Sequence, residues 1–164
     1  SDNARFLNLF GYTGAATVHA ALGGAHSTTT VDLSAHYLEW AQKNLAINGV
    51  DLQNHEMLNS DVMAWLRDAG QRYDLILVDP PTFSNTAKKK RIFDVQSHHG
   101  DLLTQAMGLL EPGGSAIFST NYRSFQLDES VRQRFICEEI TQQTIPFDFK
   151  GPTRIHRCWL LQNQ

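Results

Sequence analysis

One acidic side chain of the sequence, Asp79, stands where it could take part in chemistry, because it ends an apolar run and precedes two prolines. The run, residues 73–78, is typical of a buried parallel strand, which would bring Asp79 to the carboxyl edge of a sheet, where open α/β sheets bind ligands. Pro80 and Pro81 have no backbone N–H, so they stiffen the turn and leave carbonyl acceptors in a fixed direction. We therefore predict that Asp79, Pro80 and Pro81 form a rigid group of oxygens that holds the N–H edge of a planar base or amide. The alternative is that the three residues only end a strand.

A second candidate site is the turn from Gly11 to Gly14, which joins an apolar run, residues 6–10, to an alanine-rich stretch, residues 15–22. This order predicts a strand, a glycine turn and a helix. Glycine at both ends would let the backbone take positive φ and approach a ligand closely, and the helix offers unpaired N–H groups at its positive end. The pattern Gly-x-x-Gly is weak on its own, and a plain connector is the alternative.

Two further acids are predicted to end strands that point at the same edge. Asp32 closes a β-branched run, residues 28–33, and lies 18 positions after Gly14. Dinucleotide-binding folds use that spacing to bind a pair of ribose hydroxyls with a carboxylate. Asp61 follows a third predicted strand, residues 52–58, and could accept a hydrogen bond from an adenine amino group. Structural alternatives stay open for both: a solvated strand end for Asp32, and a helix-terminal acid that suits the helix dipole for Asp61.

The segment after the central strand, residues 84–91, is polar and basic. It is too long for a simple strand-to-helix turn, so we predict a loop above the sheet edge. Its basic run, residues 88–91, could neutralise the phosphates of a polyanion that enters the site, although such a run is more often a solvated face. His98 and His99 open the next helix, either as surface residues or as substrate contacts.

The order of the elements gives the fold class. Five predicted strands alternate with helices, and a last pair of strands forms an antiparallel hairpin, so we predict an α/β, Rossmann-like sheet that is mostly parallel. A double glycine in residues 111–114 predicts the end of the helix before the fifth strand, and the end of that strand, residues 121–123, points at the same edge as Asp79. No repeat or linker interrupts the chain, so residues 1–164 are predicted to form a single domain. The elements not yet given are helices at 35–47 (capped by Ser34), 63–69, 102–110 and 127–135, a fifth strand at 115–120, and hairpin strands at 136–149 and 154–161 joined through 151–152.

Composition limits the class of protein. With 164 residues, 41% of them apolar, the chain is long enough for one domain with a proper core. A net charge of −3 gives no general attraction to nucleic acid, so RNA binding must rest on local patches or on a partner domain. Cys137 and Cys158 lie far apart without histidines at ligand spacing, which argues against a zinc site and a disulfide framework. The absence of a membrane-length apolar stretch and of a secretory signal predicts a soluble, cytoplasmic protein with no membrane partner.

In this order the features resemble the class I S-adenosylmethionine-dependent methyltransferases: a glycine turn after strand one, acids after strands two and three, Asp-Pro-Pro after strand four and a terminal hairpin. The resemblance is closer to the C-terminal half of the bifunctional bacterial 23S rRNA guanine methyltransferases, the half that makes N7-methylguanine. It covers essentially the whole chain. The segments that carry it are LFGYTGA (9–15), DLS (32–34), VDPPTFSN (78–85), FDVQ (93–96) and IHRCW (155–159).

The resemblance implies S-adenosylmethionine as cofactor and a guanine of large-subunit ribosomal RNA as substrate, methylated at N7. It implies that the methionine part of the cofactor lies against the glycine turn, its ribose at Asp32, and its adenine at Asp61. The target base would face Asp79. The RNA-binding region and the first methyltransferase half of that family have no counterpart in the chain, so we expect a fragment of a longer protein. The residues implied in cofactor binding are Phe10, Gly11, Tyr12, Gly14, Asp32, Leu33, Asp61 and Val62, and those implied in catalysis are Asp79, Pro80 and Pro81.

Other reactions and other classes of protein stay open. Guanine N7 has a lone pair and no proton, so its methylation needs orientation rather than a general base, and Asp79 could stabilise the cationic product. Methylation of cytosine C5 is disfavoured because it needs a nucleophilic cysteine, whereas Cys137 and Cys158 fall in the hairpin strands. Methylation of guanine N2 or adenine N6 remains an alternative, as does a non-catalytic RNA-binding module with this fold. An NAD-dependent dehydrogenase would need the third glycine of G-x-G-x-x-G, which the turn lacks.

Overall fold

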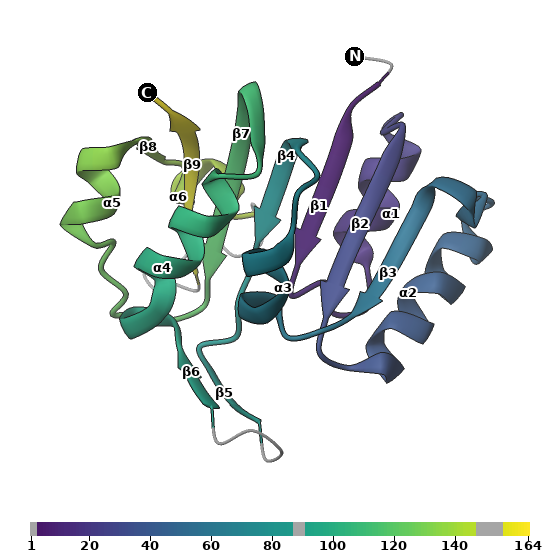
Figure 1. Cartoon of the computed structure of the whole chain (residues 1–164), viewed down its shortest axis with the longest axis horizontal. Helices are drawn as coiled ribbons and strands as arrows, with labels where there is room; N and C mark the ends of the chain where they lie inside the picture. The colour runs from purple at the N-terminus through teal and green to yellow at the C-terminus, as the bar shows by residue number, and fades with distance from the viewer. Residues whose placement is uncertain (1–2, 87–90, 147–155) are drawn as a thin grey trace.

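The computed structural model describes residues 3–86, 91–146 and 156–164 of the chain (Figure 1). Within these residues the main sheet has seven strands in the order β3-β2-β1-β4-β7-β9-β8, and β9 alone runs opposite to the other six. The predicted α/β sheet, mostly parallel with a C-terminal antiparallel pair, is confirmed. The strands are β1 (Arg5–Leu9), β2 (Ser27–Asp32), β3 (His55–Asn59), β4 (Tyr73–Val78), β7 (Leu110–Thr120), β8 (Phe135–Glu139) and β9 (Arg157–Asn163).

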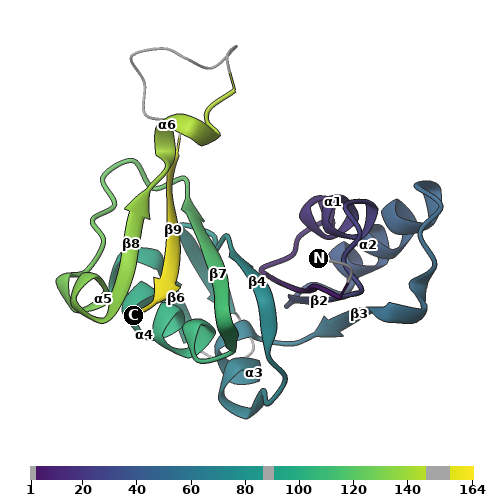
Figure 2. The same ribbon diagram turned by 90° about the horizontal axis from the view of Figure 1, so that it is seen from above.

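Helices cover both faces of this sheet. Figure 2 shows α1 and α2 on one face and α3, α4 and α5 on the other. Several begin with a side-chain cap: the predicted Ser34 hydroxyl accepts from the Tyr37 N–H at the start of α2, and Asp94 and Asp128 cap α4 and α5. The helices are α1 (Ala15–Leu22), α2 (Ala35–Ile47), α3 (Val62–Asp68), α4 (Val95–Met107), α5 (Glu129–Arg134) and α6 (Thr141–Thr144), with a 3₁₀ turn, η1 (Leu52–Asn54), before β3.

The order of the strands reverses between β1 and β4. The chain runs from β1 outward to β2 and β3, then returns to β4 and continues to β7 on the other side. The backbone N–H of Arg5 donates to the Asp74 carboxylate over 2.7 Å, which ties the start of β1 to β4. Open α/β sheets bind ligands in the crevice that such a reversal leaves beyond the carboxyl ends of the strands.

The core beneath β7 and β9 is aromatic and includes one histidine. Phe118 and Trp159 stack with ring centroids 5.7 Å apart, and Phe125 packs on both. His99, predicted as a surface residue or substrate contact, is instead 2% exposed. Its Nε2 accepts the backbone N–H of Asp128 over 2.9 Å, so its Nδ1–H donates to the Val95 carbonyl over 3.0 Å. This histidine therefore joins α4 to the loop before α5, and the expectation of a surface or substrate role was wrong.

The predicted end of the helix before the fifth strand was also wrong. Helix α4 ends at Met107, and the double glycine lies inside β7, which begins at Leu110. The pairing of β4 with β7 shifts between Tyr73 and Leu75, opposite this segment. Gly113 takes φ of 80°, and a Cβ on Gly114 would lie 2.9 Å from the carbonyl oxygen of Asp74. The two glycines are needed for an irregularity within a strand rather than for a helix terminus.

The segment predicted as a loop after β4 contains a two-stranded antiparallel hairpin, β5 (Phe83–Thr86) with β6 (Arg91–Asp94). Its polar composition hid the pairing, since a hairpin that projects from a domain has little apolar surface to bury. Figure 1 shows it below the carboxyl ends of the parallel strands. Residues 87–90, which include most of the predicted basic run, lie outside the described residues.

Two other predicted strands are shorter in the structure. Residues 52–54 form η1, because the Asp51 carboxylate accepts the Gln53 N–H and caps a turn there. The predicted strand 136–149 ends at Glu139 and is followed by α6, while the predicted connection 151–152 lies outside the described residues. The antiparallel pairing of β8 with β9 nevertheless agrees with the predicted hairpin.

Candidate active site

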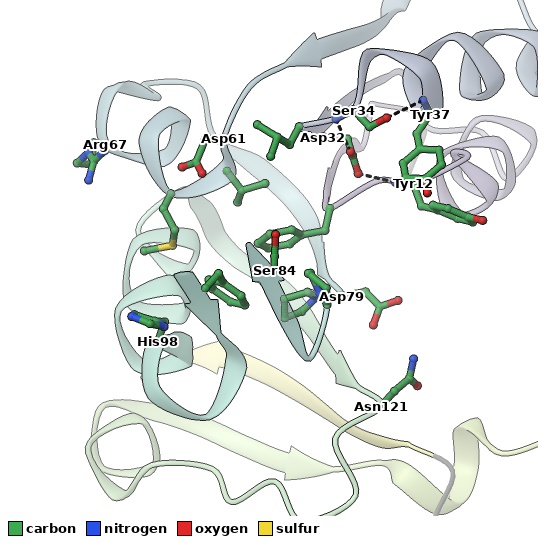
Figure 3. A pocket seen from close by; sticks show the side chains of 17 residues that line it. Tyr12, Asp32, Ser34, Tyr37, Asp61, Arg67, Asp79, Ser84, His98 and Asn121 are labelled. Atoms are coloured by element: carbon green, nitrogen blue, oxygen red, sulfur yellow. Dashed lines mark hydrogen bonds between the residues drawn. The ribbon is translucent and has the colours of Figure 1, made fainter. Parts of the chain in front are cut away.

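A cavity of about 910 Å³ opens over the carboxyl ends of the parallel strands (Figure 3). Both Asp32, from the end of β2, and Asp79, from the end of β4, line it. The structure thus brings together two acids that are 47 positions apart in the sequence (79 − 32). The predicted site residues that line this cavity are Phe10, Tyr12, Asp32, Leu33, Asp61, Val62, Asp79, Pro80 and Pro81.

Gly11 and Gly14, the other two predicted residues, do not line the cavity but shape the turn beside it. A Cβ on Gly11 would lie 2.2 Å from Cγ2 of Thr30, and one on Gly14 would lie 2.6 Å from Cβ of Ala41. Positive φ occurs at Gly14 (74°) and, contrary to the prediction for Gly11, at Phe10 (60°) and Tyr12 (48°). Gly11 is therefore required by close packing on β2, and the unusual backbone falls on its two aromatic neighbours.

The Asp32 carboxylate is held by two backbone donors. Its Oδ2 accepts the N–H of Tyr12 over 2.9 Å, and its Oδ1 accepts the N–H of Ser34 over 2.8 Å. Because each carboxylate oxygen can accept more than one hydrogen bond, both remain able to accept from a ligand. The first bond also fixes the strained turn at Tyr12 to the end of β2. This arrangement presents a preoriented pair of acceptors to the cavity, which suits a pair of adjacent hydroxyls.

Asp61 caps a helix and also lines the cavity, so the structure excludes neither of the two alternatives that the sequence left open. Its Oδ1 accepts the Ala64 N–H over 2.8 Å and caps α3, and the same side chain lines the cavity beside Val62. The helix-cap interpretation is therefore confirmed, and a contact with an adenine stays a prediction for the remaining acceptor capacity of the carboxylate.

Asp79 lies at the mouth of the cavity, where its side chain reaches solvent. The protein packed around the carboxyl raises its pKa above the ordinary aspartate value, and a hydrogen bond from Ser119 and the charge of His156 oppose that shift. Asp79 is thus a carboxylate acceptor at the cavity mouth, and a positive charge that develops nearby would be stabilised by it.

Aromatic side chains that the sequence analysis did not assign to a site form the wall of the cavity. Phe93 lies between Phe10 and His98, with ring centroids 5.6 Å from each. Tyr37 packs edge-on against Tyr12 at 4.5 Å. Figure 3 shows His98 and Arg67 on one side of the cavity and Asp79 and Asn121 on the other. The sequence analysis pointed to Asn121 by its position, to Ser34, Ser84 and Phe93 through the segments DLS, VDPPTFSN and FDVQ, and to His98 as a surface residue or a substrate contact. The lining residues to which it did not point are Tyr37, Met63 and Arg67.

Groups able to bind metals or act as nucleophiles are sparse in the part of the chain that the structure describes. There, no three His, Cys, Asp or Glu side chains gather as a metal site would require. Burial raises the pKa of both cysteine thiols, Cys137 and Cys158, which disfavours the thiolate form that attacks a base. Among the described helices none is long and apolar enough to cross a membrane.

Comparison with known proteins gives consistent matches. A model of the S-adenosylmethionine-dependent methyltransferase family matches residues 1–150. The chain is 54% identical over 155 residues to the ribosomal RNA large subunit methyltransferase K/L of Desulfotalea psychrophila, and 56% identical over 158 residues to the protein of the same name from Pseudomonas putida. These matches cover 94% and 96% of the chain but only 22% of each relative. A crystal structure of a protein assigned as a methyltransferase, in complex with SAH, superposes with a TM-score of 0.81 at 26% identity and covers 98% of this chain and 46% of that one.

Proposed function

Since the chain belongs to the family of S-adenosylmethionine-dependent methyltransferases, we propose that it transfers a methyl group to a guanine of large-subunit ribosomal RNA, at N7. The observation that carries the proposal is the shared cavity, which joins an anchored ribose-type acceptor, Asp32, to an acceptor at its mouth, Asp79. The relatives named as ribosomal RNA large subunit methyltransferases support the choice of substrate.

The residues around Asp32 fit S-adenosylmethionine, which supplies a methyl group already activated on a positively charged sulfur. The Asp32 carboxylate, fixed by two backbone N–H groups, would accept from the two ribose hydroxyls. Leu33 and Val62, which line the same cavity as Asp61, offer apolar contacts for the adenine ring. The absence of a side chain at Gly11 lets the turn lie against β2, so the Phe10 side chain and the Tyr12 backbone border the methionine part.

The mouth of the cavity fits a planar base. Asp79, with the carbonyl groups of Pro80 and Pro81, would orient a guanine so that the N7 lone pair lies in line with the bond to the methyl carbon. The bound cofactor would supply the methyl group and keep the electron pair of its S–C bond on sulfur, so the purine ring would take the positive charge. No proton has to be removed, so orientation carries most of the rate. The Asp79 carboxylate at the cavity mouth would stabilise the ring charge as it develops.

We further propose that RNA recognition draws on more than this chain. The chain spans about 22% of the length of the curated relatives it matches, and its net charge of −3 offers no general attraction to phosphates. Regions elsewhere in the complete protein would then hold the ribosomal RNA, and this chain would act as the catalytic domain of a cytoplasmic enzyme. We therefore design the tests below for the complete protein.

The test is methyl transfer from labelled S-adenosylmethionine to large-subunit ribosomal RNA that lacks the modification, followed by nucleoside analysis. We expect N7-methylguanosine from the complete wild-type protein. Asp79→Ala should abolish transfer and keep the fold, whereas Asp68→Ala, which changes an exposed acid outside the cavity, should have no effect. Labelled product at guanine N2, or full activity of Asp79→Ala, would contradict the proposal.

A further inference from the structure

Three polar side chains meet beneath the glycine turn, on the sheet face that α1 covers. Asn8 of β1 and Thr30 of β2 are partners in the parallel register, so their side chains lie next to each other on that face. The Asn8 amide donates from Nδ2 to Oγ1 of Thr17, in α1, over 3.0 Å. The hydroxyl oxygens of Thr17 and Thr30 are 2.7 Å apart, so one hydroxyl donates to the other. We call these three residues the polar triad.

The polar triad is closed to solvent. Asn8 is 2% exposed, and Thr17 and Thr30 are fully buried. Water therefore cannot replace a hydrogen bond that one of them loses, and an unpaired donor at such a place destabilises the structure. Apolar side chains of the same shape could fill this space at little cost in stability. Three paired polar groups instead favour one relative position of β1, β2 and α1, because only that position satisfies their hydrogen bonds.

The glycine turn lies directly against the polar triad. A Cβ on Gly11 would lie 2.2 Å from Cγ2 of Thr30 and 3.4 Å from Nδ2 of Asn8. The Gly11 N–H also donates to the Val31 carbonyl over 3.1 Å, which holds the turn to β2. At its other end the turn leads into α1, the helix that carries Thr17. The polar triad thus joins the strand before the turn, the helix after it and the strand against which it packs.

The same turn contacts the acid that would bind the ribose. Next to Gly11, Tyr12 donates its backbone N–H to Oδ2 of Asp32 over 2.9 Å. Tyr12 has a positive φ of 48°, a conformation that a tyrosine keeps only where its surroundings hold it. A turn that shifted on the sheet would therefore change the direction in which the Asp32 carboxylate presents its remaining acceptor positions. No residue of the polar triad lines the cavity, so its effect on a ligand would pass through the turn.

We propose that the polar triad holds the glycine turn in the geometry that binds S-adenosylmethionine, and that Thr17, which contacts both other members, is a positioning residue for the cofactor. The inference rests on the proposed place of the cofactor ribose at Asp32. Removal of the Thr17 hydroxyl should then weaken cofactor binding although no group that touches the cofactor is lost. A triad with a structural role alone would lower stability and leave the affinity of the folded protein unchanged.

The test compares two isosteric substitutions in the complete protein, Thr17→Val and a matched control, Thr29→Val. Thr29 precedes Thr30 in β2, is also buried, and its hydroxyl accepts from the Tyr73 hydroxyl over 3.1 Å on the opposite face of the sheet. Each variant leaves a buried polar group without its partner, so both should unfold at lower urea concentration than wild type. Calorimetry should show that S-adenosylhomocysteine binds Thr17→Val about tenfold more weakly, the value of one hydrogen bond to the ribose. Thr29→Val should bind it as wild type does.

Kinetics on ribosomal RNA would assign the change to this site. In the formation of N7-methylguanosine, Thr17→Val should raise the KM for S-adenosylmethionine by about the same tenfold factor, while kcat at saturating cofactor stays as in wild type. Thr17→Ser keeps the hydroxyl and should recover most of the affinity that Thr17→Val loses. Thr30→Val removes the other hydroxyl of the pair but keeps the methyl group against Gly11. It should weaken binding in the same way, and it carries the test if Thr17→Val fails to fold.

Two results would overturn the role of the polar triad. Wild-type affinity in folded Thr17→Val and Thr30→Val would leave the triad with a structural role alone. Equal weakening by Thr29→Val would show a general loosening of the sheet rather than control of the turn. Asp32→Ala tests the proposed function separately, since wild-type affinity in that variant would show that the cofactor ribose is not at Asp32, whatever the triad variants do.

Discussion

Gly11→Ala should destabilise the protein through a single contact, and Thr30→Ser should remove that cost. The new Cβ would lie 2.2 Å from Cγ2 of Thr30, closer than any two carbons can pack. The next atom, Nδ2 of Asn8, is 3.4 Å away, which is ordinary contact. Thr30 is fully buried in β2, so its methyl group cannot move aside without moving the strand. The backbone is not the obstacle, because Gly11 is not among the residues with positive φ.

Whether Gly11→Ala destabilises or stabilises the protein should depend on the residue at position 30. Overpacking of this kind costs about 1–3 kcal/mol. Thr30→Ser alone should cost about 0.8 kcal/mol for the lost methyl group, because its hydroxyl still reaches Thr17, 2.7 Å away in the wild type. In the Thr30→Ser background, Gly11→Ala meets no clash and should stabilise by roughly 0.4–1 kcal/mol, since it restricts the unfolded chain.

The assay is urea denaturation of the four proteins of this cycle, with Gly70→Ala as a control because a Cβ there meets nothing within 4 Å. The coupling between the two positions should exceed about 1.5 kcal/mol. Calorimetry should show weaker S-adenosylhomocysteine binding for Gly11→Ala alone, because relief of the clash displaces the turn that borders the cavity. An equal cost of Gly11→Ala in both backgrounds would refute the argument.

Three other predictions concern single side chains. Asp32→Ala should weaken S-adenosylhomocysteine binding by about tenfold or more in calorimetry, because the ribose loses charged acceptors worth about 1.5–3 kcal/mol; unchanged affinity would remove Asp32 from the site. Asp79→Asn should raise Tm at neutral pH, since a carboxyl whose pKa is raised by folding stabilises the protein only while protonated and loses that contribution as pH rises through the folded pKa. The gain in Tm should therefore shrink as pH falls through the same range, and a gain independent of pH would contradict it. His99→Ala should cost about 2–4 kcal/mol in urea denaturation, because it leaves a cavity and an unpaired Asp128 N–H; a cost below about 1 kcal/mol would show that the site collapses around the loss.

The central part of the fold was predictable because the apolar pattern and the chemistry agree there. The run at 73–78 is β4 to the residue, and the acid that follows it reaches the carboxyl edge as expected. Strand order in a parallel sheet brings Asp32 and Asp79 to one edge whatever the details of the connections. Residues separated widely in sequence could therefore be placed together without a structure.

The sequence-based predictions failed where one local pattern occurs in two kinds of structure. Glycines mark helix ends and strand irregularities alike, and only the register of β4 with β7 shows that Gly113 and Gly114 serve the second. The positive φ at Phe10 and Tyr12 carries no signature in the sequence, because neither is a residue that favours it. Tyr37 falls within the helix predicted at 35–47, and its contact with Tyr12 depends on how α2 sits over the turn.

Asp61 shows why the choice between a structural and a functional role could not be made from the sequence. The two interpretations were set against each other as though one carboxylate could serve only one partner. In the structure one oxygen caps α3 through the Ala64 N–H while the side chain still borders the cavity. Asp61→Ser keeps a capping oxygen and removes the charge, so it should retain the stability that Asp61→Ala loses, about 1 kcal/mol. If both variants bind S-adenosylhomocysteine more weakly by the same factor, the carboxylate contacts the adenine; if only the alanine variant does, the effect on binding comes through the helix.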